Sequence, residues 1–156
     1  VFKESGFLLA GSNPLHKELA MQECIFCKIV NGEIPCAEVY TGDSVMAFLD
    51  IAPISEGHTL IIPKTHYSTL WDLPQDLAAE MQRALQEVGT AVFQVTGATG
   101  LNVVMNNYQA AGQVVPHAHW HLIPRREGDG LLQAQQKEYD SQEAMQELAA
   151  KIHSAL

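Results

Sequence analysis

The chain has few basic side chains, and this limits what it can bind. Lys and Arg together number 9 among 156 residues, against 18 Asp and Glu, and the formal net charge is −9. A broad cationic surface that holds duplex DNA or RNA by counterion release is therefore not expected. A nucleotide ligand, if there is one, should be small, and no nucleic acid polymer is predicted as a partner.

Cysteines and long apolar runs are also scarce. The 3 cysteines are too few and too unevenly spaced for a disulfide-stapled secreted domain. No run approaches the roughly 20 apolar residues of a membrane span, and the apolar run at 7–10 is too short for a signal-peptide core. We therefore expect a cytoplasmic protein without membrane association.

The length and the apolar content favour one compact unit. With 156 residues, 47% of them hydrophobic, the chain can bury the core of a single domain. Residues 1–20 lack sustained periodicity and precede Met21, so we interpret them as an N-terminal extension or a remnant of expression. The predicted single domain covers residues 21–156.

Apolar spacing predicts one long helix over residues 75–96. Leu77, Met81, Leu85 and Val88 recur at intervals of three or four, and Gly97 stands beyond the end of the pattern. A short helical turn is expected at 24–31 and a C-terminal helix at 141–155.

Five runs favour β-strands, at 38–40, 44–49, 59–63, 101–106 and 119–124. Strands and helices do not alternate strictly, and no Gly-x-Gly-x-x-Gly follows a strand, so a Rossmann fold is disfavoured. The predicted fold is an α+β domain, with a five-stranded antiparallel sheet covered on one side by the long helix and followed by the C-terminal helix.

The densest chemistry is a stripe of alternating histidines at 117, 119 and 121. On a strand the three imidazoles share one face, which is a poor arrangement for ordinary core or surface residues. One interpretation is a three-histidine zinc site with water as fourth ligand, although same-face neighbours lie about 7 Å apart on a strand. The other is covalent catalysis by one imidazole as nucleophile.

The segment His117 to Ile123 resembles the signature of the histidine triad family, His-x-His-x-His followed by two apolar residues. The likeness extends over roughly 24–126 through further motifs: Ile25 to Ile29, Ile34-Pro35, Phe48 to Ile51, Pro53, Gly57-His58, Leu60 to Lys64, and Asn106. The resemblance implies a histidine triad fold and a nucleotide hydrolase or transferase without a catalytic metal.

By this resemblance, His119 attacks the α-phosphorus of a purine nucleoside phosphoramidate or a dinucleoside polyphosphate and forms a nucleotidyl-histidine intermediate. His121 and His58 would neutralise charge on the phosphoryl oxygens. His117 would support the hydrogen-bond network around the nucleophile.

The resemblance also implies a nucleotide site. Its members by position are Ile25, Phe26, Ile29, Phe48 and Ile51 for the base, Asp50 for the ribose, and Asn106, Gln113, Val114 and Val115 for the phosphate. Each apolar member taken singly is more often a core residue, and a solvated loop is the alternative for Gln113. Val114 departs from relatives that carry a serine there, which weakens the indication of a phosphoramidate.

Cys24 and Cys27 supply two thiolates with metal-ligand spacing. In some prokaryotic family members such a pair binds a structural zinc, and the matching histidines here are His66 and His117. Two free or mutually oxidised thiols are the alternative, and Cys36 is expected to be a small buried hydrophobe.

The resemblance further suggests a homodimer. Two other functions stay open at this point, a purine nucleotide-binding module without turnover and a zinc-dependent hydrolase that uses the stripe as ligands. The segment after Asp129 matches no family pattern, so the leaving group is not indicated by the sequence.

Overall fold

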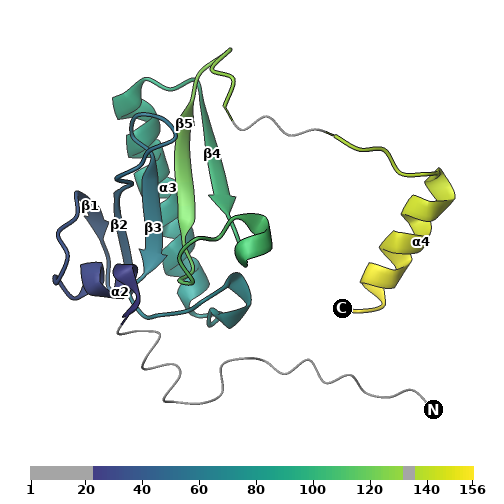
Figure 1. Ribbon diagram of the computed structural model, residues 1–156, viewed down its shortest axis with the longest axis horizontal. Coiled ribbons are helices and arrows are strands. Elements are labelled where there is room, and N and C mark those ends of the chain that lie inside the picture. The colour runs from purple at the N-terminus through teal and green to yellow at the C-terminus, as the bar shows by residue number, and fades with distance from the viewer. Residues whose placement is uncertain (1–22, 132–135) are drawn as a thin grey trace.

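The computed structural model describes residues 23–131 and 136–156 (Figure 1). The expected N-terminal extension, residues 1–20, lies outside the described residues, and the single-domain boundary 21–156 stays a prediction.

The centre of the fold is a five-stranded antiparallel sheet in the order β1-β2-β3-β5-β4. Its strands are β1 (Glu38–Thr41), β2 (Val45–Leu49), β3 (Thr59–Pro63), β4 (Gly100–Met105) and β5 (Trp120–Arg125). Each neighbouring pair is antiparallel. The predicted α+β fold class is confirmed, and the observed strands lie within one residue of the predicted ones at either end.

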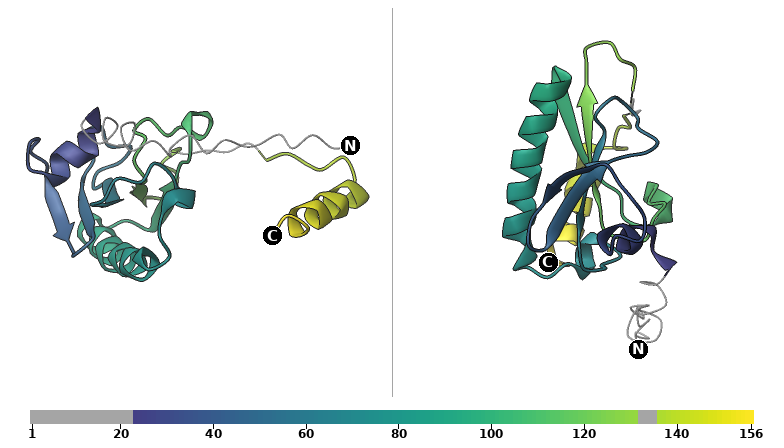
Figure 2. Two further views of the ribbon diagram at one scale, coloured as in Figure 1. Left: turned by 90° about the horizontal axis from the view of Figure 1, so that it is seen from below. Right: turned by 90° about the vertical axis from the view of Figure 1, so that its left-hand side faces the viewer.

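One face of the sheet is covered by helix α3 (Leu77–Thr96), as Figure 2 shows in its right-hand view. The predicted apolar stripe buries Leu77, Met81 and Val88 against Val45 and Leu122. The helix starts two residues later than expected, and it ends at Gly97, whose φ of +61° suits a residue without a side chain.

The opposite face is not bare, which differs from the expectation of a sheet covered on one side only. Helix α2 (Ile25–Val30) packs Phe26 and Cys27 there, against Met46, Leu60 and Ile62. The reason lies in the strands, because β3 is buried at all its positions and so needs apolar cover on both faces.

The short helices η1 (Leu70–Asp72) and η2 (Gln109–Ala111) follow β3 and β4, and the chain continues to α4 (Gln142–His153). Ser141 caps α4 by accepting a hydrogen bond from the N–H of Ala144. Every residue of α4 is exposed, and the helix lies apart from the sheet in Figure 1. Within the described residues, no helix is long and apolar enough to cross a lipid bilayer.

Candidate active site

The three stripe histidines lie on the sheet face opposite α3, on the side of α2. Strand β5 starts at Trp120, one residue later than predicted, so His117 and His119 belong to the segment before it. In this segment the N–H of Ala118 donates to the carbonyl of Tyr67, 2.6 Å away, rather than to the β3 ladder. The imidazoles still gather on one side, and the rings of His119 and His121 have centroids 4.8 Å apart.

The hydrogen bonding of His119 determines which ring nitrogen is free. Its Nδ1 lies 2.6 Å from the carbonyl oxygen of His117, and a carbonyl only accepts, so Nδ1 carries the proton. Burial lowers the pKa of His119, which favours the neutral ring. Nε2 therefore holds an unshared electron pair, the form that a nucleophile needs.

His58 and His121 form a second chain of hydrogen bonds. The N–H of Ile54 donates to Nδ1 of His58 at 3.2 Å, so the proton of this neutral ring is on Nε2. That N–H donates to Nδ1 of His121, 2.9 Å away, and leaves the proton of His121 on its Nε2. Burial lowers the pKa of His58, and burial together with the neighbouring histidines lowers the pKa of His121 to about 4.

Asp50 lies beside this chain without forming a charged pair with it. One of its carboxylate oxygens is 3.7 Å from Nδ1 of His58, but that nitrogen already accepts from Ile54. The other oxygen accepts from the N–H of Ala52 at 2.8 Å. Asp50, His58 and His121 are close enough to hold a cation, yet both nitrogens of His58 are used in hydrogen bonds, so a hydrogen-bond relay fits these residues better.

A second cluster lies on the other side of His117 and contains the predicted zinc ligands Cys24, Cys27, His66 and His117. Their four ligand atoms lie within 4.8 Å of one another, and all four residues are buried. Nδ1 of His117 is 3.4 Å from the sulfur of Cys24 and 3.7 Å from that of Cys27, and Nδ1 of His66 is 3.4 Å from the latter.

This geometry fits a tetrahedral zinc ion. Bond lengths of about 2.0–2.3 Å put neighbouring zinc ligands roughly 3.3–3.8 Å apart, and the three nitrogen–sulfur distances of 3.4, 3.4 and 3.7 Å fall in this range. Nε2 of His117 lies 2.8 Å from the carbonyl of Pro63 and donates to it, so Nδ1 is unprotonated and faces the thiols. Burial, with the neighbouring Cys24 adding to it, raises the pKa of Cys27 to about 12, so only a cation would hold this thiol deprotonated.

Aromatic residues flank the nucleophile on the α2 side. The ring of Phe26 meets the ring of His119 edge-on, with centroids 5.2 Å apart, and Phe48 lies 5.7 Å from Phe26. Ile29 and Val115 pack beside them. Phe26 and Phe48 are thus both core residues and neighbours of the candidate nucleophile.

Other members of the predicted nucleotide site face solvent. Ile51 is 95% exposed and Val114 is 90% exposed, while Ile25 is exposed to a lesser degree. Asn106 is partly buried beside Gly112.

Gln113 is buried, which rules out the solvated-loop alternative. Its side-chain oxygen accepts from the N–H of Tyr108 at 2.7 Å, and its amide nitrogen donates to the carbonyl of Ser68 at 2.6 Å. Gln113 therefore ties the loop after β4 to the segment after β3.

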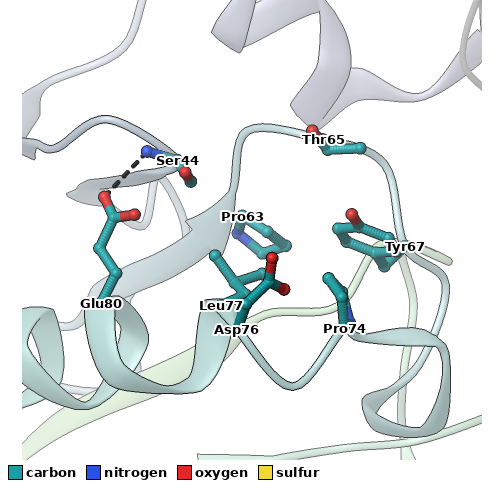
Figure 3. Close-up of a pocket in the computed structure, with 8 residues that line it drawn as sticks. All are labelled: Ser44, Pro63, Thr65, Tyr67, Pro74, Asp76, Leu77 and Glu80. Carbon is teal, nitrogen blue, oxygen red and sulfur yellow. Dashed lines mark hydrogen bonds between the residues drawn. The ribbon is translucent and has the colours of Figure 1, made fainter.

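A separate hollow of about 170 Å³ lies at the start of α3, as Figure 3 shows. Asp76 and Glu80 line it, and Glu80 accepts from the N–H of Ser44 at 2.8 Å. This hydrogen bond lowers the pKa of Glu80 and keeps it ionised. Two carboxylates disfavour a phosphate, so the hollow is a poor candidate for the nucleotide.

Two aromatic residues near Gln113 were missed by sequence reasoning. Trp71 and Tyr108 stack with ring centroids 5.5 Å apart and an angle of 14° between the planes. They are far apart in the chain, and neither stands in a periodic pattern, so no sequence signal joins them.

The comparisons with known proteins show the family of the chain. The HIT domain family matches residues 31–128. The chain therefore belongs to the HIT, or histidine triad, family.

Among its relatives, the adenylylsulfatase HINT3 of Arabidopsis thaliana is 41% identical over 122 residues, covering 78% of this chain and 62% of the relative. The chain thus spans less than two thirds of that relative's length. The adenosine 5′-monophosphoramidase hnt1 of Schizosaccharomyces pombe is 42% identical over 102 residues, or 65% of this chain and 74% of hnt1. The family relatives thus include nucleotide hydrolases.

Solved structures share the fold. A HIT family protein from Bacillus subtilis has a TM-score of 0.80 at 38% identity, covering 86% of this chain and 97% of that one. A zinc-bound histidine triad family protein from Mycobacterium smegmatis has a TM-score of 0.67 at 36% identity, covering 87% and 99% of the two chains. A zinc-bound member of the family therefore exists, and the cysteine–histidine cluster here could bind a metal.

Proposed function

We propose that the chain hydrolyses or transfers the nucleotidyl group of a purine nucleoside phosphoramidate or polyphosphate through a covalent intermediate on His119. One observation carries the proposal. Nδ1 of His119 donates to the carbonyl of His117, 2.6 Å away, which leaves Nε2 unprotonated.

In the first step Nε2 of His119 forms a bond to the α-phosphorus, and the bond from phosphorus to the leaving group breaks. The leaving group departs with the bonding electrons and takes a proton from water. In the second step water attacks the phosphorus, gives up a proton to solvent, and the N–P bond breaks with its electrons returning to Nε2. No metal is required, because the imidazole is a nucleophile in its neutral form.

The relay from His58 to His121 supplies a donor for the phosphoryl oxygens. Because His58 fixes the proton of His121 on Nε2, that N–H is oriented before substrate arrives. Such preorganised donors stabilise the charge that develops in the transition state. His117 is a positioning residue, since its backbone carbonyl orients the nucleophile.

The remaining predicted residues have supporting roles in the proposal. Phe26 and Phe48, beside Ile29 and Ile25, would form the wall for the base, with the exposed Ile51 closing over it. Asp50 would accept from the ribose hydroxyls with its second oxygen. Asn106 and the backbone at Val114 and Val115 would contact the phosphate, with Gln113 as a positioning residue for this loop.

We propose further that Cys24, Cys27, His66 and His117 hold a structural zinc ion. It would supply a cross-link between α2 and the segment before β5, and no reaction step. Metal analysis of protein purified without chelator tests this, with one zinc per chain expected. A substoichiometric value, or thiols that titrate as free in the native protein, would reject the site.

The leaving group is an open part of the proposal. One relative is named an adenylylsulfatase and another an adenosine 5′-monophosphoramidase, so related proteins differ in the group that leaves. A matched set of adenylyl sulfate, adenosine phosphoramidate and a dinucleoside polyphosphate would rank the leaving groups.

The direct test is a rapid acid-free quench of the wild-type protein with adenosine phosphoramidate, followed by peptide mass spectrometry. We expect one adenylyl group on the peptide containing His119, and none in His119→Ala. An adduct on another residue, or turnover by His119→Ala at the wild-type rate, would refute the assignment. Tight nucleotide binding with neither adduct nor release of monophosphate would favour the binding module instead.

A zinc hydrolase built on the stripe is disfavoured by the same hydrogen bonds. His117 turns toward the thiols, His121 accepts from His58, and only His119 retains an open nitrogen. Chelator-sensitive turnover without a covalent adduct would reverse this preference.

We also propose a homodimer that pairs along β4. This strand is an edge of the sheet, and Val103 in it is exposed, as are Phe93 and Val95 at the end of α3. Unpaired edges and exposed apolar side chains favour association. Sedimentation at micromolar concentration tests the proposal, and a monomer would reject it.

A further inference from the structure

Tyr108 has a backbone conformation that a side chain disfavours. Its φ is +67° and its ψ is 160°, and among the described residues it is the single non-glycine with positive φ. This region of backbone space is populated almost entirely by glycine. A tyrosine here needs both a structure that enforces the conformation and a reason for the ring.

The conformation is enforced by hydrogen bonds on both sides of the residue. The N–H of Tyr108 donates to the side chain of Gln113, and its carbonyl accepts from the N–H groups of Ala111 and Gln113 at 3.1 Å each. The N–H of Leu70 donates to the side chain of Asn107 at 2.8 Å, so η1 is fastened to the same loop. The two loops are therefore joined by hydrogen bonds.

Burial in the core does not explain why an aromatic side chain stands at position 108. Tyr108 is 56% exposed and its stacking partner Trp71 is 68% exposed. Two large aromatic rings held parallel in water, one of them on a strained backbone, are not core residues. We call Trp71 and Tyr108 the aromatic platform.

Strand pairing places the loop that carries Tyr108 near the candidate nucleophile, because Met105 at the end of β4 pairs with Trp120, the residue after His119. The order is β1-β2-β3-β5-β4, so β2 and β4 lie on opposite sides of β5. The apolar wall for the base comes from α2 and β2, whereas Tyr108 follows β4 (Figures 1 and 2). A substrate that lies across His119 with its base over β2 directs its leaving group toward β4 and the loop that follows it.

We infer that the aromatic platform stacks a planar aromatic leaving group, and that the second nucleobase of a dinucleoside polyphosphate is its natural ligand. This inference rests on the proposed function and adds a preference among leaving groups. Stacking suits every base, because each has an aromatic face, and removing one stacking ring typically weakens binding by about tenfold. The exposed rings also suit a ligand that must leave after reaction.

The first test compares two phosphoramidates of adenosine monophosphate, one with a planar aromatic amine and one with a small alkyl amine, together with diadenosine tetraphosphate. Trp71→Ala and Tyr108→Gly should lower kcat/KM about tenfold for the two substrates with aromatic leaving sides and leave the alkyl substrate unchanged. Tyr108→Gly removes the ring and accepts the positive φ, so it should melt no lower than wild type. Tyr139→Ala, which removes an exposed ring elsewhere, is the control.

A second measurement reads binding without turnover. Trp71 and Trp120 are the 2 tryptophans of the chain, so Trp120→Phe leaves Trp71 as the single indole. In a His119→Ala, Trp120→Phe protein we expect diadenosine tetraphosphate to quench Trp71 fluorescence and adenosine monophosphate to quench it less. If the two nucleotides quench Trp71 equally once Tyr108→Gly is added, Trp71 and Tyr108 bind the second base together. If the difference in quenching persists, Tyr108 is not part of the binding surface.

The outcomes separate the two proposals. Suppose that wild type turns over the alkyl phosphoramidate. If the variants then lower kcat/KM equally for all three substrates, or for none of them, the aromatic platform is rejected and the proposed function stands. If wild type turns over no substrate, the proposed function fails. Quenching of Trp71 by the dinucleotide would then still identify the aromatic platform as a base-binding surface, and its absence would reject both.

Discussion

His117 and His121 are the two ends of one stripe, four residues apart, and they lie in opposite environments. His117 is fully buried, donates a hydrogen bond from Nε2 to the carbonyl of Pro63, and turns its unprotonated Nδ1 toward two thiols. His121 is partly exposed, and its proton is set by His58 so that an N–H is left for a ligand. The chemistry of an imidazole is thus decided by the partner of its second nitrogen.

The largest effect should come from His119, between the two ends. We expect His119→Ala to lower turnover of adenosine phosphoramidate by more than about a thousandfold, because the unprotonated nitrogens of His58, His117 and His121 already accept a hydrogen bond or face the thiols. Its melting temperature and zinc content should stay close to wild type. A loss of zinc in this variant would contradict the separation of the two ends.

At the phosphate end, His121→Asn should lower kcat by about a hundredfold, the usual effect of losing one preorganised donor. His58→Asn should have a smaller effect of the same sign, because it acts through His121. Steady-state rates with unchanged zinc content check both. Equal effects of the two substitutions would show that His58 acts on the substrate directly.

At the thiol end, Cys27→Ala should abolish binding of the proposed zinc and lower the free energy of unfolding by a few kcal/mol. Turnover per folded molecule should fall far less than in His119→Ala. Thermal melting with metal analysis measures the first effect and initial rates at low temperature the second. Cys36→Ala, which removes a thiol outside the cluster, is the matched control.

The smallest expected effect is a loss of folding stability at low pH. The pKa of His121 is lowered from 6.5 to about 4, mainly by burial, and burial also lowers that of His58. Below pH 6.5 the unfolded chain therefore binds more protons, and the stability that is fully present above 6.5 is lost progressively toward pH 4. Melting temperatures at successive pH values should show this decline.

The double variant His58→Asn, His121→Asn should make that decline shallower. His153→Asn, on the exposed helix α4, should not change it. An unchanged slope in the double variant would assign the acid sensitivity to other groups.

The sequence predicted most of the fold, because its periodic signals are local. The apolar spacing that predicts α3 and the β-branched run that predicts β3 are each formed by residues close together in the sequence, and both elements are confirmed. The role of α2 as cover for the second face was not predicted, since six residues carry too little periodicity to identify a partner.

The sequence predicted which residues belong to the candidate site better than it predicted how they are arranged. The resemblance to the histidine triad family indicated a metal cluster at 24, 27, 66 and 117, and the structure brings these four residues together. The tautomers could not be predicted, because they depend on the N–H of Ile54 and the carbonyls of Pro63 and His117. Backbone groups have no signature in a sequence.

The carbonyl of His117 that orients the nucleophile belongs to the peptide backbone, while the thiol cluster uses the side chain of the same residue. Any amino acid at this position would offer that carbonyl. Residue 117 therefore has two roles that a substitution can separate, orientation of His119 by its carbonyl and contact with the thiols by its imidazole. A related protein that has lost the thiols and this imidazole keeps the carbonyl that orients the nucleophile. The metal cluster and the catalytic histidine can therefore change independently in evolution.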